Sequence, residues 1–127
     1  MVVTLRETGH VVMIKKKSVL LSLFGASGYR YKLSQYVFGK VWGVEGALPA
    51  VGGVFVFMKR LFNKRCGCFV YEFCHAGEAS DLSALSVGEL AKEHKALLAA
   101  SCVGVLPVPD VTERARIASD IIRRNLA

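Results

Sequence analysis

The sequence predicts an α/β domain with a small antiparallel or mixed β-sheet of three or more strands, flanked by helices. Four segments have the apolar or alternating pattern of strands: 29–37, 53–58, 69–74 and 102–108. Two capped helical segments begin near Ser86 and Asp110, one on each side of the last of these strands. Helices that alternate with strands in this way are typical of an α/β layer arrangement.

The N-terminal part of the chain predicts one half-buried strand and a preceding apolar one. Residues 1–12 have no clear periodicity and are either a mobile arm or an additional strand. Val19–Phe24 is apolar and ends at the turn composition of 25–28, and 29–37 alternates between apolar and polar residues. We therefore expect an N-terminal arm with an extra strand over 1–28, and the main domain over 29–127.

A β-hairpin with a basic loop is expected in the middle of the chain. Gly39–Gly53 contains five glycines and Pro49, which predicts an irregular crossing anchored by Trp42. The strands 53–58 and 69–74 follow, and a short loop joins them. Four cations of this loop make it the best candidate for contact with nucleic-acid phosphates, or else a solvated loop that prevents edge-to-edge pairing. These cations are Lys59, Arg60, Lys64 and Arg65.

Ser86 and Glu89 form a capping-box pattern that predicts the first helix. Its apolar stripe includes Leu90 and Leu97, with His94 on the same face, where a packed core histidine is the simpler interpretation. The last helix begins at Asp110, and we expect one face of it to pack on the sheet. The apolar residues of that face are Val111, Ala115, Ala118, Ile121 and Ile122. The charged residues expected to be solvated are Arg114, Arg116, Asp120, Arg123 and Arg124.

Composition predicts a single folded domain with an affinity for polyanions. At 127 residues, with 53% apolar and 21% charged residues, the chain can bury a core without help from disulfides or metals. The 17 Lys and Arg against 10 Asp and Glu give a formal charge of +7, which favours nucleic acid by counterion release.

The cysteine pattern and the hydropathy of the chain predict the cellular compartment of the protein. The four cysteines, Cys66, Cys68, Cys74 and Cys102, are too few and too unevenly spaced for a secreted disulfide framework, so we expect reduced thiols and a cytoplasmic protein. Their spacing also lacks the paired CxxC of the common zinc modules. No stretch reaches the roughly 20 apolar residues that a membrane span requires.

Two short motifs occur on the strands of the predicted hairpin. The first is Gly53-Val54-Phe55, and the second is His75-Ala76-Gly77, followed by Glu78-Ala79-Ser80-Asp81-Leu82. Together with the order hairpin, helix, strand, helix, and with Arg114, Ile117 and Asp120-Ile121-Ile122 near the end, they resemble the GIY-YIG nuclease family. The resemblance covers about 100 residues, from Tyr29 to the C-terminus, and implies a fold of GIY-YIG type.

The resemblance implies phosphodiester cleavage by two tyrosines, an arginine and a metal-binding glutamate. At the matching positions this chain has Phe55, His75, Leu85 and Ala118. None of the four keeps the functional group that the family uses, and loss of one preorganised charge contact commonly costs 10²–10³ in rate. We therefore expect a catalytically degenerate domain that binds nucleic acid or another partner, with no resident metal.

Two alternatives remain open at this point. The first is a divalent-metal-dependent endonuclease, using Mg²⁺ for example, in which His75 acts as a base because histidine titrates near neutral pH. The second is a structural or protein-binding homodimer that uses the apolar strand Val19–Phe24. DNA or RNA and a second copy of the chain are the partners expected, and a membrane is not.

Overall fold

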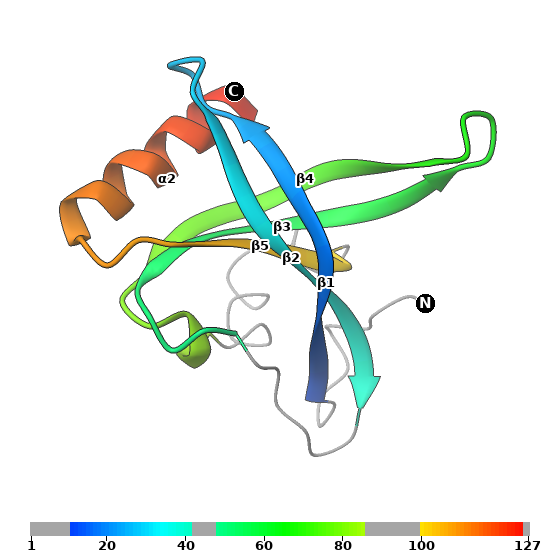
Figure 1. Cartoon of the computed structure of the whole chain (residues 1–127), viewed down its shortest axis with the longest axis horizontal. Coiled ribbons are helices and arrows are strands. Elements are labelled where there is room, and N and C mark those ends of the chain that lie inside the picture. The colour runs from blue at the N-terminus through cyan, green and yellow to red at the C-terminus, as the bar shows by residue number, and fades with distance from the viewer. Residues whose placement is uncertain (1–10, 42–47, 86–99, 126–127) are drawn as a thin grey trace.

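The computed structural model of the chain describes residues 11–41, 48–85 and 100–125 (Figure 1). In chain order the strands are β1 (Val11–Phe24), β2 (Arg30–Val41), β3 (Gly53–Asn63), β4 (Cys68–Ala79) and β5 (Cys102–Pro107). A short 3₁₀ helix, η1 (Leu82–Ala84), follows β4, and the α-helix α2 (Val111–Asn125) follows β5. The α/β class is confirmed for these residues.

The strands form one curled sheet in the order β1-β2-β5-β3-β4, and every neighbouring pair is antiparallel. β5 is inserted between the two hairpins β1–β2 and β3–β4, which cross each other in Figure 1. β1 is longer than the expected strand over 19–24, and β2 continues through Gly39–Val41, which had been expected to begin an irregular crossing. Antiparallel pairing between β1 and β2 extends from Val11↔Val41 to Phe24↔Arg30, so β1 belongs to the same sheet.

Side chains alternate between two cores on opposite faces of the sheet. One face carries Phe55 and Phe57 of β3 with Val103 and Val105 of β5, covered by Leu82 of η1. The other face carries a second set of buried side chains and is covered by α2. Its buried members are Tyr31, Leu33, Val54, Val56, Met58, Ala76, Cys102, Ile117, Ala118 and Ile121. The alternation predicted for β2 is confirmed at Tyr31 and Leu33, which are 4% and 0% exposed, whereas Tyr29 is 65% exposed.

Helix α2 begins as predicted, and three of the five residues predicted for its packing face lie in the core against the sheet: Ala118, Ile121 and Ile122. Asp110 caps it by accepting a hydrogen bond from the Glu113 backbone amide. Val111, expected to be buried, is 61% exposed, whereas Arg114 and Asp120, expected to be solvated, are 7% and 3% exposed. The prediction was wrong for Arg114 and Asp120 because it assigned charged residues to solvent, although both of these side chains meet charged or polar groups of the β1–β2 hairpin or of β4.

The β3–β4 hairpin extends past the end of β5 and forms an arm on the right of Figure 1. β3 pairs with β5 only from Gly53 to Met58, and pairing with β4 continues for five more residues, from Lys59 to Asn63. The loop between the two strands is therefore shorter than the sequence predicted. Lys59 and Arg60 lie in β3, and only Lys64 and Arg65 lie in the turn, because cross-strand pairs continue to Asn63↔Cys68.

Some predictions fall outside the described residues. They are the helix expected after Ser86, its residue His94, the anchor Trp42 and residues 1–10 of the expected N-terminal segment.

Candidate nucleic-acid interface

The two motifs lie side by side on neighbouring strands. In the β3–β4 register Phe55 is opposite Gly77, and Phe57 is opposite His75. The rings of Phe55 and His75 are 6.1 Å apart between centroids. The hairpin thus brings together two segments that are 20 residues apart in the sequence.

Both motif glycines are required by close packing. A Cβ on Gly77 would lie 2.9 Å from Cζ of Phe55, so the phenyl ring occupies the space above this glycine. A Cβ on Gly53 would lie 2.5 Å from the carbonyl oxygen of Leu106 in β5. The two glycines therefore have a structural role: Gly77 leaves room for the Phe55 ring, and Gly53 allows β5 to approach β3 closely.

Three of the four positions that the GIY-YIG resemblance singled out share one face of the sheet. Phe55 is 4% exposed in the core, Leu85 packs against the same cluster, and His75 is half-buried beside Phe55. Ala118 lies on the opposite face, in the core beneath α2. The four residues are therefore not brought together, and Phe55, Leu85 and Ala118 offer no group that titrates or holds a metal.

Arg114 connects α2 to the second motif. Its Nε donates to Oε1 of Glu78 at 2.8 Å, and its Nη1 donates to the carbonyl oxygen of Pro109 at 2.8 Å. The guanidinium also lies against Gly52, where a Cβ would be 2.5 Å from Nη1. Arg114 is therefore a buried structural cation, whereas the sequence had predicted that it would be solvated.

Asp120 is the centre of a second buried network. Its carboxylate accepts hydrogen bonds from the Tyr31 hydroxyl at 2.7 Å, and from the Ser27 hydroxyl and backbone amide at 2.7 and 2.9 Å. These hydrogen bonds, that of Tyr31 first, lower the pKa of Asp120 from 3.8 to about 2. Burial and the same bond raise the pKa of Tyr31. The network ties the β1–β2 turn to α2.

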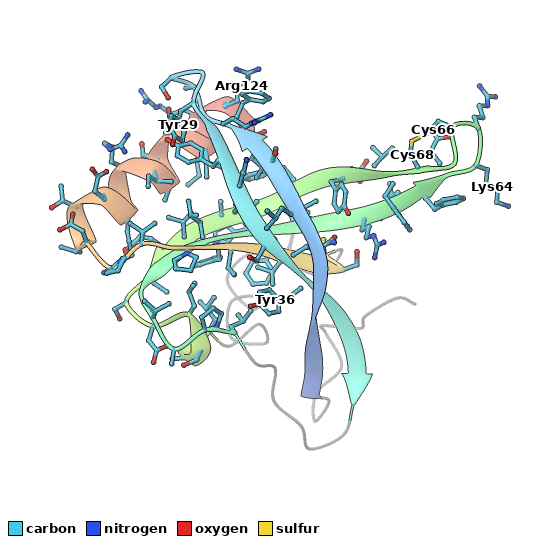
Figure 2. All side chains as sticks on the ribbon, viewed as in Figure 1. Tyr29, Tyr36, Lys64, Cys66, Cys68 and Arg124 are labelled. Atoms are coloured by element: carbon cyan, nitrogen blue, oxygen red, sulfur yellow. A yellow bond between two sulfur atoms is a disulfide. The ribbon has the colours of Figure 1, made fainter. Side chains whose placement is uncertain are left out.

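The arm carries a cluster of positively charged residues that is separate from these two networks. Residues 59–72 contain four Lys or Arg and one carboxylate, Glu72. Lys64 and Arg65 are exposed in the turn, and Figure 2 shows Lys64 at the far end of the arm, remote from Tyr29 and Arg124. Lys59 and Arg60 are half-buried near its root. The four predicted cations therefore line one projecting ribbon, with two at each end.

A disulfide closes the tip of the arm. Cys66 and Cys68 are bonded, with their Cα atoms 5.3 Å apart around Gly67. Gly67 has a φ of +65°, a left-handed conformation that favours glycine and lets the chain reverse between the two cysteines. The expectation of reduced thiols is wrong at these two positions, because spacing alone did not reveal this turn.

Cys74 and Cys102 are free thiols. Burial raises the pKa of both, to about 12 for Cys102, which disfavours the reactive thiolate. Among the described residues no group of three or more His, Cys, Asp or Glu is placed to hold a metal ion. None of the helices in the described part of the chain is long and apolar enough to cross a membrane.

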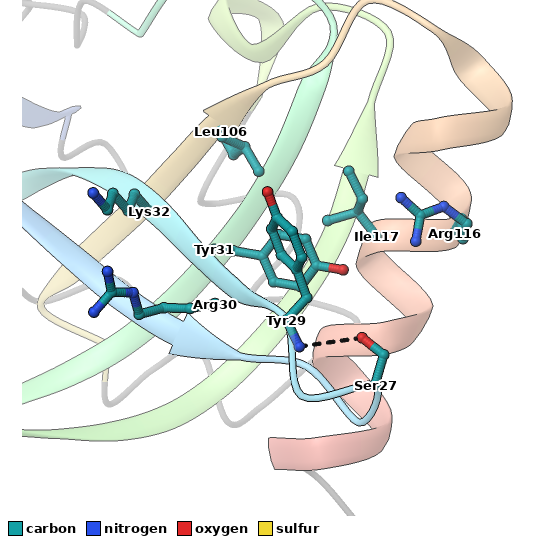
Figure 3. A pocket seen from close by; sticks show the side chains of 8 residues that line it. All are labelled: Ser27, Tyr29, Arg30, Tyr31, Lys32, Leu106, Arg116 and Ile117. Carbon is teal, nitrogen blue, oxygen red and sulfur yellow. Dashed lines mark hydrogen bonds between the residues drawn. The ribbon is translucent and has the colours of Figure 1, made fainter.

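A pocket of about 660 Å³ lies between the start of β2 and α2 (Figure 3). The rings of Tyr29 and Tyr31 are 4.8 Å apart, and Arg116, which also lines the pocket, pairs with Glu113 at 2.7 Å. The other lining residues are Ser27, Arg30, Lys32, Leu106 and Ile117. One of the three cations of this pocket is already ion-paired, and the Asp120 carboxylate accepts hydrogen bonds from two of its lining residues, so the pocket is less suited to an anion than the arm.

Sequence reasoning found the four cations but missed the aromatic residues between them. Phe62 and Phe69 are opposite each other in the register and are 55% and 48% exposed. Their equal distance from the turn at 64–67 was the signal that could have identified them as a cross-strand pair. No family model, curated protein or solved structure matches this chain.

Proposed function

We propose that this protein is a nucleic-acid-binding module on a framework of GIY-YIG type whose catalytic positions are changed, and that the β3–β4 arm contacts the phosphates. The observation that carries the proposal is the projection of a two-stranded ribbon with four cations and one carboxylate beyond the body of the sheet. Cations on a projecting ribbon can approach a nucleic-acid backbone without a clash from the rest of the domain.

The changed positions support binding without cleavage. Phe55 and Leu85 are apolar side chains in one core, and Ala118 lies in the other. Phosphodiester cleavage needs a group that activates water and a group that stabilises the developing charge. His75 is the one titratable side chain of the four, because the other three positions supply neither an arginine nor a carboxylate.

The test is fluorescence anisotropy with labelled single-stranded and duplex oligonucleotides at several KCl concentrations. The arm variant K59Q/R60Q/K64Q/R65Q removes four cations and lowers the formal charge from +7 to +3. We expect weaker binding and a plot of log affinity against log salt that is flatter by roughly 3, since each phosphate contact contributes about 0.7 to 0.9 to the slope.

The matched control R30Q/K32Q/R123Q/R124Q removes the same number of charges from exposed positions outside the arm. We expect this control to keep most of the wild-type slope. An equal loss in both variants would assign the affinity to net charge, and an unchanged slope in the arm variant would exclude the arm as the phosphate site.

Homodimer formation through β1 is a second candidate function. Leu20 and Phe24 are 59% and 46% exposed on this strand, which lies at the edge of the sheet. By strand alternation Leu20 points away from the core that contains Leu21 and Leu23, so it adds apolar surface to this edge strand, whereas the Phe24 ring lies 5.8 Å from the guanidinium carbon of Arg124 in α2. Light scattering that gives a dimer mass for the wild type and a monomer mass for L20K would support it.

A further inference from the structure

Two exposed phenyl rings lie on one face of the arm. Phe62 and Phe69 are a cross-strand pair with ring centroids 5.3 Å apart and an interplanar angle of 66°. The next register pair on the same face is Arg60 and Tyr71. Half-exposed aromatic rings in a ribbon that the rest of the sheet does not cover are typical of an interaction surface.

Cations flank the rings along the ribbon. The guanidinium carbon of Arg60 lies 3.6 Å from the centroid of the Phe69 ring. Arg60 precedes Phe62 by two residues in β3, and Lys64 follows Phe62 by two residues and lies in the turn. The aromatic pair therefore has Arg60 on the side of the root and the turn cations Lys64 and Arg65 on the side of the tip.

We propose that this face binds single-stranded nucleic acid, with a base stacked on the Phe62–Phe69 pair. Arg60, Lys64 and Arg65 contact the neighbouring phosphates. Every base offers an aromatic face to such a platform, whereas in a duplex those faces are already stacked inside the helix. The inference rests on the proposed function and adds to it a class of substrate and a means of selecting it.

The root of the arm holds this face in place. The Tyr71 hydroxyl donates to Oε1 of the buried Gln35 in β2 at 2.8 Å, and the Arg60 backbone amide donates to Oγ of Ser101 at 2.8 Å. These bonds anchor both strands of the arm immediately before the aromatic pair. The platform is therefore ordered before a ligand binds, which reduces the entropy cost of binding.

The arrangement of the tip favours nucleic acid over a lipid surface. The opposite face of the ribbon carries the aliphatic pair Leu61 and Val70, which are 38% and 43% exposed. The most distal residues, however, include the exposed Lys64 and Arg65. Insertion of the tip into a bilayer would place these charges deepest, where they cost the most.

The test compares binding of labelled dT12 and of a 12-base-pair duplex by anisotropy, with wild-type protein and three double variants. F62L/F69L removes both rings but keeps every cation. L61A/V70A is the matched control, because it changes a register pair on the opposite face of the same ribbon. F62Y/F69Y restores aromatic rings at the original positions.

We expect the wild type to bind dT12 more tightly than the duplex, and F62L/F69L to weaken dT12 binding about tenfold or more with an unchanged salt slope. The control should change it less than about twofold, and F62Y/F69Y should bind like the wild type. Equal affinity for dT12 and duplex, or wild-type binding by F62L/F69L, would overturn the inference.

The outcome separates this inference from the proposed function. If the arm variant K59Q/R60Q/K64Q/R65Q weakens salt-dependent binding and F62L/F69L leaves it unchanged, the stacking of a base on the aromatic pair is excluded and the proposed function is kept. If the wild-type protein binds neither oligonucleotide, both proposals are excluded. Flotation with vesicles of phosphatidylcholine and phosphatidylserine, lost in F62L/F69L and unaffected by dT12, would instead assign the rings to a lipid surface and overturn the inference.

Discussion

Arg114 of α2 and Glu78 of β4 form an ion pair in which Nε and Oε1 are 2.8 Å apart. The arginine side chain is 8% exposed and that of the glutamate 37%, so the two partners are not equivalent. Arg114 also donates to the Pro109 carbonyl, and this links the start of α2 to the loop after β5. The pair therefore holds the only α-helix of the described residues against the sheet.

This asymmetry predicts unequal costs for the two partners. R114M should lower the free energy of unfolding by about 3 kcal/mol, because it leaves the Pro109 carbonyl and Glu78 without their buried donor. E78Q should cost about 1 kcal/mol, since its carboxylate is partly solvated and an amide oxygen can still accept the bond. Urea denaturation of both variants measures the difference, and equal costs would contradict the predicted asymmetry.

Asp120 predicts a specific loss of stability in acid. Its pKa is lowered to about 2 in the folded protein, below the ordinary 3.8 that applies to the unfolded chain. The stabilisation is therefore complete above about pH 4 and is lost as the pH falls through about 2, where the folded carboxylate takes up its proton.

The check is the urea midpoint of wild type and D120N between pH 2 and 6. We expect the wild type to exceed D120N at pH 6 and the difference to shrink toward pH 2. The control Y31F removes the hydroxyl that contributes most to the shift, so it should reduce the pH dependence without abolishing it. A difference between wild type and D120N that is constant with pH would contradict this origin.

Absence of nuclease activity is expected even when tyrosines are introduced at both motif positions. Purified wild type and F55Y/H75Y should both leave supercoiled DNA intact with Mg²⁺ or Mn²⁺, because Leu85 and Ala118 still provide no arginine or carboxylate. Agarose-gel electrophoresis is the measurement. Metal-dependent cleavage by the wild type that H75A abolishes would instead establish the endonuclease alternative.

Removal of the Cys66–Cys68 disulfide should have a small effect on global stability. The closed loop contains only three residues, for which the chain-entropy model gives about 1.6 kcal/mol. C66S/C68S should therefore shift the urea midpoint slightly, and the reductant TCEP should shift the wild type by the same amount and leave the variant unchanged. A loss above about 3 kcal/mol would mean that the tip contributes to the core.

Much of the sheet could be predicted from local pattern. The alternation around Tyr31 and Leu33, the β3–β4 hairpin, β5 and the Asp110 cap were all readable because they depend on residues close together in the chain. The length of the arm was not readable, since β3 continues past Met58 by pairing with β4 alone. Lys59 and Arg60 were thereby moved from a loop into a strand.

By itself, the sequence determined the α/β class, the positive charge of the hairpin and the side-chain chemistry available at Phe55, His75 and Leu85. Only the tertiary structure decided that Ala118 lies on the other face of the sheet and that Phe62 and Phe69 form an exposed pair between cations. The physical reason is that functional groups at a position are local, whereas the face and neighbours of a side chain depend on strand register and on which element covers the sheet.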